Sequence, residues 1–171
     1  MGAGKVLLIL GAILTILGTY VFAIYGATGI VGSGIGFILN MIGAGLISPG
    51  LFAGADFYAT GLGIEVWIFY ILVIVFIIFL ASGVLQFLGL KSRVFSFLFS
   101  LFALGIGLMF IFLTYTDILG IKSTFFAIFF IGEQYGNIFP VLVNLGDLAL
   151  GAYFLIAGGA LGFISAFMER D

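Results

Sequence analysis

The sequence predicts an all-α integral membrane protein, built as a bundle of four transmembrane helices. Two features of composition and one of patterning predict this fold class. The chain of 171 residues is 64% hydrophobic and only 7% charged, whereas soluble domains average about 25% charged residues. The few charges divide the chain into long apolar blocks. Lipid must therefore be the solvent for much of the chain, and its length predicts a single membrane domain, residues 1–171.

The apolar blocks give the positions of the spans. A helix needs about 20 apolar residues to cross a hydrocarbon core of roughly 30 Å. Each predicted span begins or ends next to a charged residue. The predicted spans are residues 5–26, 65–90, 94–116 and 147–168.

Basic residues set the predicted orientation. With four spans, Lys5, Lys91, Arg93 and Arg170 fall on one side of the membrane and only Lys122 falls on the other. Positive charge favours the cytoplasmic side. We therefore expect a multi-pass protein of the cell membrane with both termini in the cytoplasm.

A fifth span is the alternative, because residues 30–48 are uncharged. It would place Lys91 and Arg93 on the opposite side from Lys5, against the charge rule. The segment is also rich in glycine, and each glycine weakens a helix by up to about 1 kcal/mol. We therefore expect residues 30–48, and likewise residues 123–131, to lie in the interface or to re-enter the membrane without crossing it.

Two segments of the chain resemble each other in spacing. Asp56 follows Pro49 by seven positions, and Asp147 follows Pro140 by the same number. Gly, Ile and Leu also recur at equal offsets in both segments. Either the chain is a duplication or the match is a coincidence in a low-complexity apolar sequence. The duplication predicts two parallel two-span repeats.

The repeat hypothesis assigns the same elements to residues 5–90 and 93–168. Each half would hold a span, a short outer helix, a turn from Pro to Asp and a second span. The short helices are expected at residues 35–42 and 125–131. Parallel repeats are one way to build transporters, with sites at the repeat interface.

Each residue of the repeat turn has two interpretations. Pro49 and Pro140 would end the short helices, since proline removes a backbone donor. Asp56 and Asp147 would then cap the next helices, where a carboxylate accepts free amide N–H groups. Alternatively, the two acids line an outer mouth for cations. Inside the spans, Gln86 is expected to make an interhelical hydrogen bond, with a pore-lining role as the alternative.

Small residues predict where helices touch. Gly151, Gly158 and Gly162 share one face of the last span, and Gly11 and Gly18 share one face of the first. Small residues let helix backbones approach closely in lipid. These faces serve packing within the chain or between chains.

Phenylalanine is abundant in the third span and in the loop that follows it. These side chains are expected to face lipid or a partner subunit. They are Phe95, Phe97, Phe99, Phe102, Phe110, Phe112, Phe125, Phe126, Phe129 and Phe130.

Several chemistries are disfavoured by composition. The chain has no cysteine and no histidine, so thiolate catalysis, most zinc sites and the commonest general base are absent. A net charge of −2 offers no basic surface for nucleic acid. We expect no cofactor, no metal site and no catalytic site.

These observations predict a non-enzymatic structural or accessory membrane subunit. It would self-assemble as a homo-oligomer or pack with other subunits of a larger membrane complex, with the lipid bilayer as its solvent. The alternative is a small channel or transporter with paired re-entrant outer segments.

Overall fold

The computed structural model describes residues 2–118 and 126–169. In this part of the chain, three helical segments are long and apolar enough to cross a membrane. They are α1 (Ala3–Ile16) with the π-turn η1 (Leu17–Val21), α4 (Val66–Leu85) with the 3₁₀ turn η2 (Gln86–Leu90), and α5 (Arg93–Tyr115). These helices give the chain the character of a helical membrane protein.

A further apolar helix, α7 (Leu150–Ser165), is shorter than the predicted span 147–168. The strands β4 (Asn144–Leu145) and β5 (Leu148–Ala149) precede it as an antiparallel hairpin, which takes the residues expected to begin the helix. At about 1.5 Å per residue, the 16 residues of α7 measure about 24 Å. Helix length alone therefore does not establish the predicted count of four spans.

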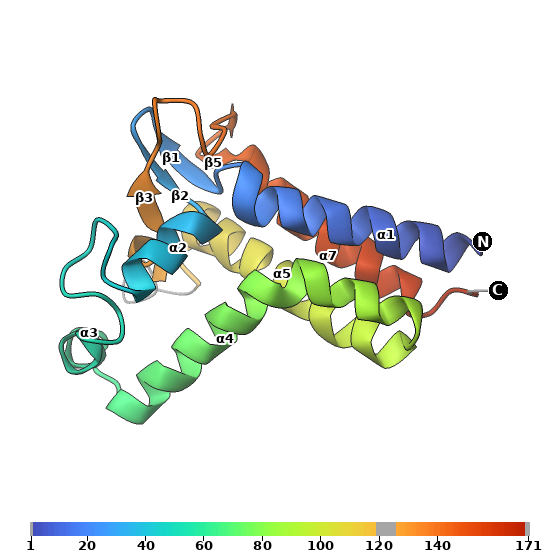
Figure 1. Cartoon of the computed structure of the whole chain (residues 1–171), viewed down its shortest axis with the longest axis horizontal. Coiled ribbons are helices and arrows are strands. Elements are labelled where there is room, and N and C mark those ends of the chain that lie inside the picture. Colours follow the sequence, from blue (N-terminus) through green and yellow to red (C-terminus); the bar gives the residue numbers. More distant parts are fainter. Residues whose placement is uncertain (1, 119–125, 170–171) are drawn as a thin grey trace.

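Helices α1 and α7 run antiparallel along one another. Gly18 lies against Gly151 at one end of the contact, and Gly11 lies against Gly158 further along. In the first turn of α1, the backbone N–H of Gly4 donates a hydrogen bond of 3.1 Å to the carbonyl of Glu169, which lies beyond the end of α7. The two ends of the described chain therefore lie at the same end of the bundle (Figure 1).

Helix α4 returns antiparallel to α1, since Gly83 lies against Ile16 and Gly89 against Leu8. Helix α5 then packs beside both α4 and α7. The helices are therefore neighbours in the order α1, α4, α5, α7 and alternate in direction. The turn from η2 to α5 lies at the end of the bundle that holds both termini (Figure 1).

The other end of the bundle carries a cap, formed by residues 22–65 and 126–149. Its three-stranded antiparallel sheet joins the two connections: β1 (Tyr25–Ala27) and β2 (Ile30–Gly32) form a hairpin, and β3 (Ile131–Glu133) pairs with β2. The sequence predicts short helices and turns here, but no strands. Strands of three residues are too short to show an alternating pattern, so the sheet left no periodic signal.

One short helix of the cap agrees with expectation. Helix α2 (Gly34–Met41) begins after Ser33, whose side chain accepts a hydrogen bond of 3.1 Å from the Gly36 amide. Its eight residues span about 12 Å. That length is too short for a bilayer crossing, in keeping with the expectation that residues 30–48 do not cross.

The second expected short helix, residues 125–131, is observed only in part. Residues 126–128 are helical, but Ile131 already belongs to β3. Pairing with β2 therefore takes the end of the predicted helix. Phe125 lies outside the described residues.

A break in the helix separates the cap from α4. Helix α3 (Ala55–Leu62) ends at Gly63, which adopts a left-handed conformation with φ of 67°. Glycine accepts this conformation without steric cost, so the chain turns there and α4 begins at Val66. Figure 1 shows α3 beside the start of α4, on the opposite side of the molecule from β5.

Aromatic side chains form the core beneath the cap. Phe129 and Phe130 are almost completely buried, and the Phe130 ring centroid lies 5.0 Å from that of Phe37 and 5.3 Å from that of Phe110. Tyr58 packs edge-to-face on Phe129. The expectation that the phenylalanines of the third span and the following loop face lipid or a partner is therefore wrong for Phe110, Phe129 and Phe130.

Other phenylalanines of α5 are exposed, as expected from the sequence. Phe95, Phe97 and Phe112 are exposed. The helix thus has one exposed apolar face and a second face toward the core.

The two-repeat architecture is not confirmed. Helix α2 ends at Met41, well before Pro49, and β3 precedes Pro140, so neither proline ends a short helix as expected. Asp56 lies in the first turn of α3, whereas Asp147 lies in the turn of the β4–β5 hairpin. The first Pro-to-Asp segment therefore leads into a helix and the second into a hairpin.

Candidate functional site

The helix-packing glycines singled out from the sequence lie where α1 and η1 contact α7. We call Gly11, Gly18, Gly151, Gly158 and Gly162 the glycine seam. A Cβ added to Gly11 would lie 2.7 Å from the Gly158 carbonyl oxygen and 2.8 Å from the Gly162 nitrogen. A Cβ on Gly18 would lie 2.7 Å from the Gly151 carbonyl oxygen. The backbones therefore touch directly, and the seam packs within the chain.

A second close contact joins α7 to α5. A Cβ on Gly159 would lie 2.5 Å from the backbone nitrogen of Leu104, and one on Gly107 would lie 2.6 Å from the Ile156 side chain. Sequence reasoning did not single out Gly159 or Gly107. The Gly158–Gly159 pair was the available signal, because adjacent helix residues point about 100° apart. Two glycine faces on α7 allow it to pack between two helices.

A buried hydrogen bond crosses from η2 to α1. The Nε2 of Gln86 donates to the Thr15 Oγ1 at 3.1 Å, and this hydroxyl donates to the Gly11 carbonyl at 2.9 Å. Both side chains are fully buried. The interhelical hydrogen bond expected of Gln86 is confirmed, and such bonds stabilise helix association in lipid by around 1 kcal/mol.

Serine hydroxyls continue this polar region between α5 and α7. Ser96 Oγ and Ser165 Oγ each donate to the Gly162 carbonyl, at 2.9 and 2.7 Å, and lie 2.8 Å from each other. Ser100 Oγ donates to the Ser96 carbonyl. We call Thr15, Gln86, Ser96, Ser100 and Ser165 the polar cluster. It connects α1, η2, α5 and α7.

The chemistry of the polar cluster is that of neutral dipoles. Its side chains are hydroxyls and one amide, so none of them titrates near neutral pH. Within the described chain, the Oε1 of Gln86 and the Oγ of nearby Ser82 are buried without a hydrogen-bond partner. In lipid, polar groups must find partners inside the protein. The cluster is suited to holding helices in register.

In the cap, Asn40 joins three segments, a role that sequence reasoning missed. Its side chain is fully buried. The Nδ2 donates to the carbonyls of Phe129 at 3.0 Å and Ile131 at 2.7 Å, and the Oδ1 accepts from the Ile47 amide at 3.3 Å. The Asn40 carbonyl accepts from the Leu51 amide. Asn40 therefore ties α2 to the loop after it and to the start of β3.

Gln134 has a similar role beside the sheet. Its backbone N–H donates to the Gly29 carbonyl at 2.9 Å, and its side-chain Oε1 accepts from the Gly29 backbone N–H at 3.1 Å. Its Nε2 donates to the Pro140 carbonyl at 3.0 Å. The β1–β2 turn is thereby fixed against residues 134–140.

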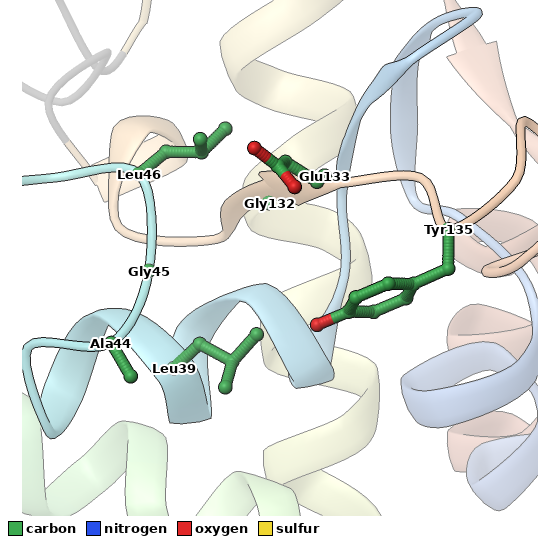
Figure 2. Close-up of a pocket in the computed structure, with 7 residues that line it drawn as sticks. All are labelled: Leu39, Ala44, Gly45, Leu46, Gly132, Glu133 and Tyr135. Carbon is green, nitrogen blue, oxygen red and sulfur yellow. The ribbon is translucent and has the colours of Figure 1, made fainter.

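Between α2 and β3 the cap has a pocket of about 100 Å³. Its lining residues are Leu39, Ala44, Gly45, Leu46, Gly132, Glu133 and Tyr135. Figure 2 shows the Glu133 carboxylate and the Tyr135 ring on its walls. One carboxylate is a sparse ligand set for a hard cation, and the described residues hold no group of three His, Cys, Asp or Glu side chains. The volume suits roughly three water molecules.

The acids and prolines of the two predicted repeat turns lie in different structural settings. Pro49 accepts a hydrogen bond from the Tyr58 hydroxyl through its carbonyl, and burial raises the pKa of that tyrosine. Asp147 does not cap α7, whose N-cap residue is Ala149. Asp56 on α3 and Asp147 beside β5 lie on opposite sides of the molecule (Figure 1). Within one chain, the structure does not bring these two carboxylates together.

Comparison with known proteins finds no similarity that identifies the chain. No family model, no curated protein and no solved structure matches it.

Proposed function

We propose that the protein is a non-enzymatic membrane subunit that assembles with other membrane-embedded chains through the tip of its cap. The partner is either a second copy of the chain or a larger membrane complex. We call Ile30, Tyr135, Ile138 and Phe139 the cap tip. The single observation that carries the proposal is the exposure of this apolar surface, which is 72% for the Ile138 side chain and 55% for Ile30.

Hydrogen bonds hold the cap tip in place. Gln134 forms hydrogen bonds between the β1–β2 turn and the neighbouring turn, and the backbone N–H of Tyr135 donates to the Phe139 carbonyl. Figure 1 shows the sheet beyond the end of α1, at the end of the bundle away from both termini. Exposed apolar patches on folded domains mark contacts with proteins or membranes. The cap tip therefore fits a neighbouring chain that contacts this end of the bundle.

The proposed topology has four crossings. Helix α7 accompanies α1 from the Gly18–Gly151 contact to the Gly4–Glu169 hydrogen bond. If α1 crosses the membrane, α7 therefore covers the same depth, although it is the shorter helix. Alternating helix directions then bring both termini to one side.

The proposed orientation places this side in the cytoplasm. Lys5, at the start of α1, and Lys91 and Arg93, at the turn into α5, lie at the end of the bundle that holds the termini. Clustered basic residues favour the cytoplasmic side. Lys122 and Arg170 lie outside the described residues.

Cysteine labelling tests this topology without a background signal, because the chain has no cysteine. A Ser92→Cys variant is expected to react with a membrane-impermeant thiol reagent only after the membrane is opened. An Asn144→Cys variant, in the exposed β4 strand, is expected to react in intact cells. Labelling of both variants from the same side would contradict the four-crossing topology.

Assembly is tested by charging the cap tip. Ile138→Asp is expected to reduce the particle extracted in mild detergent to a single chain, because a carboxylate at an apolar contact must be desolvated. Particle mass and composition are the measurements. Ile42→Asp is the matched control: its side chain is 64% exposed but lies outside the cap tip, so the particle should be unchanged. A wild-type particle of 18.2 kDa protein mass, or equal loss in both variants, would overturn the proposal.

A further inference from the structure

A groove of about 240 Å³ lies between the start of α5 and the end of α7. The start of α5 and the end of α7, which form this groove, lie at the end of the bundle that holds both termini, away from the cap (Figure 1). The lining residues are Arg93, Val94, Phe97, Ala166 and Phe167. Among the described residues that line it, the groove therefore combines apolar side chains with one positive charge and no negative charge.

The apolar part of the groove continues over a group of three rings. The Phe163 ring centroid lies 5.2 Å from that of Phe97 and 5.3 Å from that of Phe167. Phe167 and Val94 remain 69% and 71% exposed. These side chains lie at the ends of membrane helices, where an apolar surface is covered by hydrocarbon. An acyl chain suits this surface.

The charged part of the groove is available to an anion. Arg93 is exposed, and its guanidinium makes no hydrogen bond or ion pair with the described chain. Ser92, the N-cap residue of α5, makes no side-chain bond to the first turn. The free amide N–H groups there add to the positive potential. Arginine is well suited to phosphate oxygens, which accept charge-assisted hydrogen bonds.

We propose that this groove binds an anionic phospholipid, with the headgroup phosphate at Arg93 and an acyl chain over Phe97 and Phe167. The geometry places a positive group directly beside an apolar floor, which matches the join between headgroup and chain. Basic pockets between membrane helices commonly hold anionic headgroups. This inference uses a different surface from the cap tip and does not depend on assembly.

Lipid binding to the purified protein tests the proposal. Phosphatidylglycerol and phosphatidylcholine with identical acyl chains are titrated in detergent, and bound lipid is counted by native mass spectrometry. The wild-type chain is expected to prefer phosphatidylglycerol. Arg93→Gln is expected to weaken phosphatidylglycerol binding about fivefold, since one basic residue near a lipid surface contributes about 1 kcal/mol. Phosphatidylcholine binding should change little.

Lys91→Gln is the matched control, because Lys91 is exposed in the same turn but does not line the groove. Its binding of phosphatidylglycerol should stay within about twofold of wild type. Phe167→Ala should weaken both lipids, which separates the acyl contact from the charge. Equal binding of both lipids to wild type, or equal loss in Lys91→Gln and Arg93→Gln, would overturn the proposal. Full competition by glycerol phosphate would show a phosphate site without lipid and would also overturn it.

Discussion

Gly158→Leu is expected to separate α1 from α7 and to destabilise the fold severely. A Cβ at this position would lie 2.6 Å from the Thr15 Oγ1 and 2.7 Å from the Gly11 carbonyl oxygen. Neither backbone can retreat without breaking the contact along the glycine seam. Overpacking of a well-packed interior costs about 1–3 kcal/mol and occasionally more. At the upper value, the melting temperature in detergent should fall by about 6–12 °C.

Gly105→Leu is the matched control for this prediction. Gly105 also lies in a membrane helix, but nothing approaches its Cβ position within 4 Å. The same change in side chain and helix propensity should therefore leave the melting temperature nearly unchanged. If Gly158→Leu melts like wild type, the seam does not hold the bundle together. Since leucine favours a helix more than glycine does, equal loss of stability in both variants would show that the leucine side chain costs stability in this bundle whatever its contacts.

The glycine seam could be predicted from sequence because its physical requirement is local. Helix backbones touch only where small residues recur on one face, and that spacing is visible in Gly158 and Gly162. The long apolar helices could be predicted equally well, since a bilayer crossing demands an uninterrupted apolar segment. The start of α7 was missed because Leu148 and Ala149 pair with strand β4 in a hairpin, which their apolar character does not reveal.

Phenylalanine shows where sequence reasoning fails in a membrane protein. Lipid and protein interior are both apolar, so composition does not separate Phe130, which is buried, from Phe95, which is exposed. In a soluble protein, water would impose that distinction through polar neighbours. The burial of Phe129 and Phe130 therefore depended on contacts with α2 and α4 that no periodicity encodes.

The cap could not be predicted from the sequence for a further reason. Its sheet pairs Ile30 with Glu133, residues far apart in the chain, through strands too short to carry a pattern. The available signal was a polar residue without an obvious role: Asn40 stands in the uncharged segment 30–48. An amide in such a segment indicates a buried hydrogen-bond partner, and the structure supplies three.

Asn40→Leu is expected to loosen the cap while the helix bundle remains folded. Leucine has a similar size but no polar atoms, so the carbonyls of Phe129 and Ile131 and the amide of Ile47 lose their partner. Each buried polar group left without a hydrogen bond costs about 1–3 kcal/mol, which amounts to roughly 3 kcal/mol or more for the three together. Since the cap and the glycine seam are separate contacts, opening should be local.

Hydrogen exchange resolved along the chain measures this effect. In Asn40→Leu, amide exchange should accelerate in residues 42–51 and 129–133, while α1 and α7 keep wild-type protection. Asn144→Leu provides the control, because Asn144 is exposed and its replacement leaves these three groups bonded. Unchanged exchange in both cap segments would show that Asn40 does not hold them. Loss of protection throughout α1 and α7 would instead show that cap and bundle unfold as one unit, which would make the sheet as important to the membrane helices as their own glycine contacts.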